Sequence, residues 1–280
     1  MKLLRHGVLG SEKPGIIDHE GKIRDLSSHI PDINGDSINS ESLKKIGAID
    51  LSTLPIVSNT TRLGACVGNV GKFLCIGLNY SDHVAESGLP VPSEPILFSK
   101  ATSAIVGPND NVEIPRNSSE TDWEVELGII IGKKAKYINE NEAEEYIAGY
   151  CVVNDVSERA FQIKREGQWT KGKSCDTFGP TGPYLVTKDE IPDVQNLKMY
   201  LDVNGKRMQD GSTNTMIFSA KHIVYYLSQF MSLNPGDVIA TGTPPGVGLG
   251  MKPPVFLNAG DTMKLGIEGL GEQNQICIQG

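Results

Sequence analysis

Acidic and apolar residues alternate in the stretch TDWEVELGIIIG, which runs from Thr121 to Gly132. Asp122, Glu124 and Glu126 alternate with Trp, Val and Leu, and a run of isoleucines follows. A period of two predicts a β-strand, because residues two apart on a strand point to the same side. The three carboxylates are therefore expected to share one face of the strand, while the apolar side chains pack on the other face.

Two interpretations of this acidic face stay open. The strand can lie at the edge of a sheet with its carboxylates in water, since carboxylates are mostly exposed in proteins. The carboxylates can instead surround a divalent cation that neutralises their repulsion, because oxygen ligands suit Mg²⁺, Mn²⁺ and Ca²⁺. The strand alone favours the solvated face.

Further elements are predicted on both sides of this strand. KFLCIGLNY is an apolar strand that leads into a short helix, SDHVAESG, and a polar helical stretch covers 139–146. A buried strand over 150–153 ends near Asp155. NLKMYLDVNGKR alternates and then turns at Asn204 and Gly205, and an Asn-Gly pair between two alternating runs predicts a β-hairpin.

Composition narrows the classes of partner. The 280 residues carry a formal net charge of -8 without a block of Lys or Arg, which argues against a nucleic-acid partner or an anionic membrane. No apolar run approaches the roughly 20 residues that a membrane helix needs, and MKLLRHGVLG lacks the apolar centre of a signal peptide. A cytoplasmic protein acting on small molecules is therefore expected.

The glycines and proline of the segment 51–71 indicate a connector. It separates a small β-rich N-terminal domain over residues 1–70 from a main domain over residues 71–280. His6, His19 and His29 in the first domain have no partner at metal spacing and are predicted to be solvated. The five cysteines are scattered without a Cys-x-x-Cys pair, which predicts buried, reduced thiols.

A candidate base lies on the predicted helix SDHVAESG. His83 and Glu86 are three residues apart, so they share a helix face and can touch. A carboxylate beside an imidazole orients it and raises its basicity, as general-base catalysis near neutral pH requires. The alternative is an ordinary exposed pair of little energetic value. Asp155 at its strand end is a third carboxylate ligand or, alternatively, the N-cap of the turn that follows.

Other polar residues could serve the same site. Arg159 and Gln162 follow Asp155 by about one helical turn and could face the site or pair with surface groups. Lys173, in a loop rich in Gly, Pro and Lys, could balance the carboxylates, hold an anionic substrate or be solvated. In the loop ATGTPPGVGLG, Thr241 and Thr243 could donate to a carboxylate or keto oxygen.

Several segments resemble the recurring blocks of the fumarylacetoacetate hydrolase family, in the family's order: GLNYSDHVAESG, PILFSK, TDWEVELGIIIGK, GYCVVNDVSERAFQ, GKSCDTFGPTGPYLVT, VNGKRMQDGST and NPGDVIATGTPPGVG. The resemblance runs from about Lys72 to Gly271. It implies an α+β fold, a mixed β-sandwich roll of the fumarylacetoacetate hydrolase type with a small N-terminal domain, and a homodimer.

The resemblance also implies the roles of the candidate residues. A metal ion, Mg²⁺ or alternatively Mn²⁺ or Ca²⁺, would be held by Glu124, Glu126 and Asp155. The catalytic residues would be His83 and Glu86, on a short lid helix, together with Lys173 near the substrate. Substrate contacts are expected from Tyr80, Arg159, Gln162 and Thr243.

The implied activity is a metal-dependent hydrolase that cleaves a C-C bond in a 2,4-dioxo acid. The substrate would be an acylpyruvate or a 2,4-dioxo-3-deoxy sugar acid, and pyruvate would leave through a metal-stabilised enolate. His83, oriented by Glu86, would activate the attacking water. The alternatives are a ureidoglycolate lyase, a 2-oxo acid decarboxylase or isomerase on the same site, and a metal-binding or scaffold protein without activity.

Overall fold

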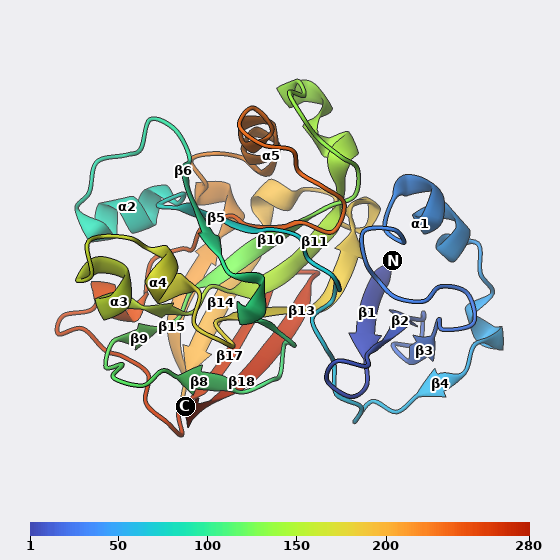
Figure 1. Ribbon diagram of the computed structural model, residues 1–280, viewed down its shortest axis with the longest axis horizontal. Helices are drawn as coiled ribbons and strands as arrows, with labels where there is room; N and C mark the ends of the chain where they lie inside the picture. The colour runs from blue at the N-terminus through green and yellow to red at the C-terminus, as the bar shows by residue number, and fades with distance from the viewer.

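The computed structural model describes residues 1–280, leaving aside the side chain of Ser87. Two mixed sheets form its body (Figure 1). The larger sheet has eleven strands, and ten follow the order β4 (Ile56–Val57), β3 (Ile23–Asp25), β2 (Lys13–Ile17), β1 (Lys2–His6), β13 (Gly179–Thr187), β11 (Ile147–Asn154), β10 (Val125–Ile131), β16 (Val238–Ala240), β5 (Phe73–Gly77) and β6 (Ile96–Lys100). The eleventh strand, β7 (Ile105–Val106), pairs with β13.

The second sheet has five strands, in the order β15 (Lys206–Ser212), β14 (Lys198–Val203), β17 (Thr262–Ile267), β18 (Gly271–Gln279) and β8 (Val112–Ile114). A separate short pair is formed by β9 (Thr121–Asp122) and β12 (Ser157–Glu158). Parallel pairs such as β16 with β5 and β18 with β8 stand among antiparallel ones. The predicted α+β class with mixed sheets is confirmed.

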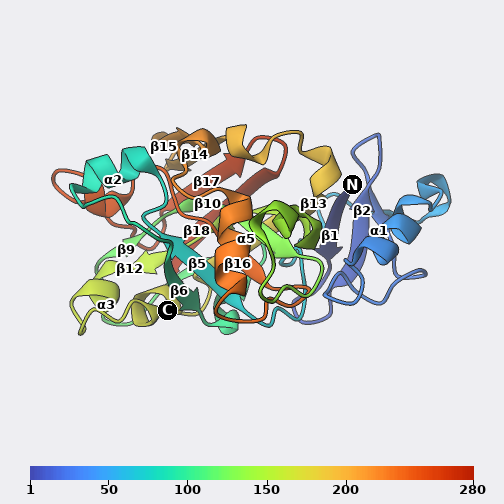
Figure 2. The ribbon, with the colours of Figure 1, turned by 90° about the horizontal axis from the view of Figure 1, so that it is seen from above.

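The helices are short and lie outside the sheets. They are α1 (Ser40–Gly47), α2 (Ser81–Ser87), α3 (Arg159–Ile163), α4 (Thr170–Lys173) and α5 (Ala220–Ser228). Turns of 3₁₀-helix cover Leu51–Thr53, Thr102–Ala104, Glu140–Tyr146, Lys188–Glu190, Val194–Asn196, Thr213–Thr215 and Gly248–Gly250. Figures 1 and 2 both place α2 and α3 at the end of the molecule opposite α1 and the N-terminal strands. Within the described residues, no helix has the length and apolar character to cross a membrane.

The acidic segment lies at the centre of the larger sheet. Strand β10 pairs with β11 on one side and with β16 on the other, so it has no free edge. Val125, Leu127 and Ile129 point into the core between the two sheets, whereas Ile130 packs against the core on the opposite face. All seven residues of β10 are buried. The interpretation as a solvated edge strand is therefore wrong, since both faces and both edges of the strand are covered.

The N-terminal strands extend the larger sheet. Strand β1 pairs antiparallel with β13, with Leu3 opposite Leu185, and β2, β3 and β4 follow outward. Leu3 and Ile16 share one apolar cluster with Ile130 and Val238 of the central strands. The boundary near residue 70 stays a prediction, and the sheet runs continuously across it because β13 offers its edge to β1.

Several local predictions are confirmed. Asn204 and Gly205 connect β14 to β15 with φ of 51° and 75°, the left-handed pair that a tight hairpin of this kind requires. SDHVAESG contains α2, while the helix predicted over 139–146 is a 3₁₀-helix at Glu140–Tyr146. All five cysteines are free thiols, and four of them are buried.

His6 differs from its prediction. His19 and His29 are exposed as expected, but only 5% of His6 is exposed, because it ends β1 beneath the neighbouring strands. Its Nε2 atom lies 3.8 Å from Asp25 Oδ2 without a hydrogen-bond partner. Burial lowers the pKa of the His6 imidazole below its ordinary value of 6.5, although the charge of Asp25 partly opposes the shift.

This lowered pKa makes the folding stability depend on pH. The unfolded chain binds a proton at His6 more readily than the folded chain does, so the free energy of unfolding should fall as the pH drops below about 6.5. We expect His6→Gln to lose less stability between pH 7.5 and 5.5 than the wild type, by up to about 1.4 kcal/mol per pH unit. Urea unfolding at both pH values measures this difference, and His19→Gln should behave like the wild type. Equal losses of unfolding free energy in all three proteins would contradict the assignment of this pH dependence to His6.

Candidate active site

A cavity of about 590 Å³ lies beside α2, α3 and α4. Strands of the larger sheet position two of its polar residues: Glu126 stands in β10, while Thr243 follows β16. Its charged and polar lining consists of His83, Glu86, Glu124, Glu126, Arg159, Gln162, Lys173, Thr243 and Lys252. Eight of these nine residues are ones that the sequence proposed for the site.

The three predicted metal ligands come together. Glu124 stands just before β10, Glu126 within it, and Asp155 directly after the neighbouring β11. The backbone N-H of Asp155 donates to Glu124 O at 2.9 Å, which fixes the two strand ends against each other. One oxygen from each carboxylate lies within 4.8 Å of the others, and all three residues are buried. Asp155 lies behind the cavity wall, where Lys173 contacts it.

Two lysines hold Asp155. Lys173, at the end of α4, places Nζ 2.8 Å from Asp155 Oδ2 and 2.7 Å from Glu124 Oε2. Lys100, at the end of β6, donates to the other oxygen of Asp155 and to Val156 O at 3.0 Å. Both ammonium groups are buried. The contacts of Lys173 therefore agree with the prediction that it balances the carboxylates. The alternative of a solvated loop lysine is wrong, because its side chain is buried.

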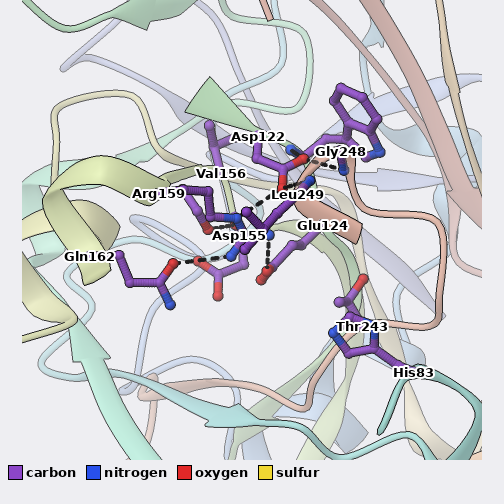
Figure 3. A network of polar contacts seen from close by, with 12 residues as sticks. His83, Asp122, Glu124, Asp155, Val156, Arg159, Gln162, Thr243, Gly248 and Leu249 are labelled. Carbon is purple, nitrogen blue, oxygen red and sulfur yellow. Dashed lines mark hydrogen bonds and ion pairs between the residues drawn. The ribbon is translucent and has the colours of Figure 1, made fainter. Parts of the chain in front are cut away.

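Arg159 joins a fourth carboxylate to this cluster. Its guanidinium donates from Nε to Asp122 Oδ2 at 2.8 Å and lies 2.7 Å from Glu124 Oε1 through Nη2. Nη1 donates to Gln162 Oε1 at 3.1 Å (Figure 3). Arg159 and Gln162 thus face the site, as one of the two sequence alternatives proposed. Arg159 orients the carboxylates from its place at the start of α3, where backbone hydrogen bonding to Glu120 O anchors it.

The protonation states follow from these contacts. Burial opposes ionisation of Glu124, but Lys173 and Arg159 outweigh it and lower the pKa of this carboxyl to about 2. Burial and the negative charges of Asp155 and Glu124 raise the pKa of Glu126 well above its ordinary value. Glu126 has no place in any ion pair of the described residues and accepts a hydrogen bond from Gly242 N at 2.8 Å.

The donor set fits a divalent cation. Within the cluster, four carboxylates (Asp122, Glu124, Glu126 and Asp155) face three cations (Lys100, Arg159 and Lys173). The carboxyl of Glu126 is thus left without a cationic partner, and its ionisation in this buried place is costly unless a cation binds beside it. Oxygen atoms of three carboxylates are the ligands that Mg²⁺, Mn²⁺ and Ca²⁺ prefer, and each oxygen has more than one lone pair to offer.

His83 and Glu86 form the predicted pair on α2. Nδ1 of His83 lies 3.1 Å from Glu86 Oε2, and both side chains line the cavity. When Nδ1 carries the proton toward Glu86, Nε2 is left as the basic nitrogen. Gly246 N donates to Glu86 Oε1 at 3.1 Å, so a loop after β16 holds the carboxylate from the other side. Gly246 has a φ of 102°, and a Cβ there would lie 2.0 Å from Met208 O, so only glycine fits.

The same loop reaches the carboxylate cluster. Gly248 N and Leu249 N donate to the two oxygens of Asp122 at 2.7 and 3.0 Å, while Asp122 also accepts from Arg159 (Figure 3). A continuous series of contacts therefore runs from the pair on α2 through the loop to Asp122, Arg159 and Glu124. This series connects the candidate base to the candidate metal ligands.

Two residues proposed for substrate contact lie differently. The Tyr80 side chain is fully buried with its hydroxyl 3.2 Å from Met199 Sδ, and Tyr80 is absent from the described lining of the cavity. It immediately precedes α2 and anchors the helix in the core, so the prediction that its side chain contacts the substrate does not fit its position. Thr243 lines the cavity, but its hydroxyl donates to Val125 O at 2.9 Å and therefore has no second proton to give.

The sequence reasoning missed Lys100 and underused Asp122. Lys100 closes PILFSK, and a lysine at the end of a largely apolar strand was the available local signal for a buried cation. Asp122 belongs to the alternating acidic pattern, but its partners come from residues 37 and 126 positions later in the chain. Such partners cannot be read from local spacing.

The chain belongs to the fumarylacetoacetate hydrolase family: residues 72–276 match the family described as fumarylacetoacetate (FAA) hydrolase C-terminal. It is thus an enzyme of a hydrolase family. A protein of Burkholderia orbicola (strain AU 1054), named "Putative hydrolase", is 62% identical over 276 residues, which cover 98% of both chains.

Solved structures agree over the whole chain. The fumarylacetoacetate hydrolase of Exiguobacterium antarcticum has a TM-score of 0.88 and 36% identity, covering 100% of both chains. The maleylpyruvate hydrolase of Sphingobium sp. SYK-6, solved with manganese(II) and pyruvate, has a TM-score of 0.83 and 28% identity, again covering 100% of both chains. The fold expected from the sequence resemblance is confirmed.

Removal of one buried cation should destabilise the protein. Lys100→Met leaves Asp155 buried with one of its two ammonium partners, and breaking a buried ion pair costs about 3–5 kcal/mol. We expect a loss of this size in the free energy of unfolding, measured by urea denaturation in EDTA. Lys134→Met, at an exposed lysine, should change it by less than about 0.5 kcal/mol. Equal effects of the two substitutions would rule out a structural role of the Lys100 charge.

Proposed function

We propose that this protein is a divalent-metal-dependent hydrolase that cleaves the C3-C4 bond of a 2,4-dioxo acid and releases pyruvate. The observation that carries the proposal is the joint presence of a buried carboxylate trio and a His-Glu pair in one cavity. The similarity to a maleylpyruvate hydrolase that binds manganese(II) and pyruvate supports it.

Glu124, Glu126 and Asp155 would hold the cation, which we expect to be Mg²⁺ or Mn²⁺. When bound, it supplies positive charge as a Lewis acid for the carboxylate and keto oxygens of a 2-oxo acid. Lys173 keeps its own positive charge, because Asp155 and Glu124 raise the pKa of its ammonium group against the effect of burial. It therefore adds to the positive field at the floor of the cavity.

The residues of the chain account for the proton transfers. His83 Nε2, with Nδ1 oriented by Glu86, takes a proton from water while the water oxygen bonds to C4 of the substrate. The C3-C4 bond breaks, its electron pair passes to C3 and the C2 carbonyl, and a proton then adds to C3. The products are pyruvate and the carboxylic acid formed from the acyl part, so water supplies all the added atoms.

The role of His83 can be tested against a matched pair elsewhere in the molecule. His222 lies 3.1 Å from Glu140, the same separation as in the His83 pair, but lines no part of the cavity among the described residues. We expect His83→Gln to lower kcat for pyruvate release by about 10²–10⁴, the usual contribution of a general base. His222→Gln should retain the wild-type rate. A full rate in His83→Gln would remove it as the base.

Metal dependence is tested with a panel of 2,4-dioxo acids. EDTA-treated protein should release no pyruvate until Mg²⁺ or Mn²⁺ is restored. In Glu126→Gln, we expect Mn²⁺ affinity, measured by electron paramagnetic resonance, to fall by at least about tenfold, because one of three anionic ligands is lost. Glu113→Gln, at an exposed position, should bind Mn²⁺ as the wild type does.

The same panel distinguishes other chemistry on this site. Release of glyoxylate from ureidoglycolate, without pyruvate from any dioxo acid, would replace the proposed reaction with a lyase reaction. Unchanged Mn²⁺ binding by Glu126→Gln would instead remove the metal assignment and leave the reaction to be explained by protein groups alone.

A further inference from the structure

The buried end of the cavity, here called the floor, contains Glu126 and Lys173, whereas its exposed end, here called the mouth, contains Leu89, Ile163 and Leu249. Two of the cavity's charged residues, Glu126 and Lys173, lie deep and are each only 2% exposed, whereas Glu86 and Lys252 are exposed. Its most exposed apolar lining residues are Leu89 and Ile163, at 51% each, and Leu249, at 38%. Large apolar side chains that remain exposed around a cavity indicate a surface that a ligand covers.

These mouth residues come from three separate elements. Leu89 follows α2, Ile163 ends α3, and Leu249 lies in the 3₁₀-turn Gly248–Gly250. Because the three segments are far apart in the sequence, an apolar residue in each is not the by-product of one amphipathic helix. The fold brings them around the same opening.

The wall between floor and mouth is also apolar. Trp169 packs edge-on against Phe98 with ring centroids 5.3 Å apart. Trp169 also lies tightly over Gly77, where an added Cβ would meet its ring at 2.7 Å. Ile76, Val247 and Met251 line the same cavity. A group extending from the floor to the mouth therefore passes fixed hydrocarbon surfaces.

We propose that the mouth is a binding site for a hydrocarbon acyl group, and that Ile163 and Leu249 determine this specificity. The inference rests on the proposed function, since the carboxylate and keto end of the substrate would occupy the floor. It assigns the substrate to the 2,4-dioxo acids whose C4 carries an apolar chain. It disfavours the 2,4-dioxo-3-deoxy sugar acids suggested by sequence resemblance.

Desolvation decides between these two substrate classes. Each methylene that leaves water for an apolar wall gains binding free energy, equivalent to about fourfold in affinity when fully buried. A hydroxyl moved to the same wall loses its hydrogen bonds to water and finds no partner on Leu, Ile or Phe side chains. A polyhydroxylated tail would therefore bind more weakly than a hydrocarbon tail of equal length.

Lys252 is the competing feature. It is exposed, lines the cavity and takes part in no ion pair among the described residues, so it could bind a terminal carboxylate. A flexible exposed ammonium contributes little against water, whereas three apolar residues surround the opening. We therefore assign the mouth to a hydrocarbon group, and a dicarboxylic 2-oxo acid becomes one arm of the test.

The experiment measures binding without hydrolysis. Straight-chain 2-oxo acids from four to eight carbons share the proposed head group but have no 4-oxo group, so no C-C cleavage follows. Calorimetry with the Mn²⁺-loaded protein should show affinity rising about two- to fourfold per methylene. Ile163→Asn, at an exposed position, should flatten this dependence, while Ile56→Asn, at a position in β4 that is also exposed, should preserve it.

Three results would overturn the inference. The first is an affinity that does not rise with chain length, including no binding of the longest acid, and the second is a rise that Ile163→Asn leaves intact. The third is a six-carbon 2-oxo dicarboxylate that binds more tightly than the six-carbon 2-oxo monocarboxylate and loses this advantage in Lys252→Met. The proposed function is judged separately by pyruvate release. A length dependence without hydrolysis of any 2,4-dioxo acid would support the apolar mouth and refute the reaction.

Discussion

The ion pairs on the buried carboxylate of Asp155 determine how the site is assembled. Lys100 comes from β6 and Lys173 from α4, while Asp155 directly follows β11. A charge inside a protein is tolerated only when opposite charges and hydrogen bonds surround it. Correct folding of the chain therefore requires β6, α4 and the end of β11 to come into contact. The same pairs, extended through Arg159, keep Glu124 ionised near neutral pH, as a metal ligand must be.

Asp122 extends this constraint to the His83-Glu86 pair. It accepts hydrogen bonds from Gly248 N and Leu249 N, and the same loop donates from Gly246 N to Glu86. The orientation of Glu86, and hence of His83, thus depends on a loop whose other end is attached to the carboxylate cluster. Since the loop contacts both groups through backbone N-H, its conformation matters more than its side chains. Glycine is required at residues 246 and 248 of this loop, because a Cβ there would lie 2.0 Å from the backbone oxygen of Met208 or Val255, respectively.

The sequence predicted those features that depend on residues close together in the chain. The alternation around Glu124 and Glu126 identified the strand and its two faces, and Asn204-Gly205 identified a hairpin. It did not place β10 at the centre of a sheet, because edge and central positions depend on which strands pair with it. The burial of Tyr80 and the pairing of Lys100 with Asp155 depend in the same way on contacts between distant segments. Family resemblance supplied the grouping of Glu124, Glu126 and Asp155, which spacing alone left open.

A charged floor beneath an apolar mouth has a consequence for hydrolysis itself. An acyl chain bound among Leu89, Ile163 and Leu249 would displace water from the opening. With less water inside the cavity, the electrostatic interactions between the charges there would be screened less. The attraction between the floor cations and a developing negative charge on the substrate would strengthen accordingly. In the proposed hydrolysis, water must nevertheless remain beside His83, because it would be the second reactant. The polar His83-Glu86 pair lines the cavity and would offer such a water a hydrogen-bonded position, which the apolar lining residues would not.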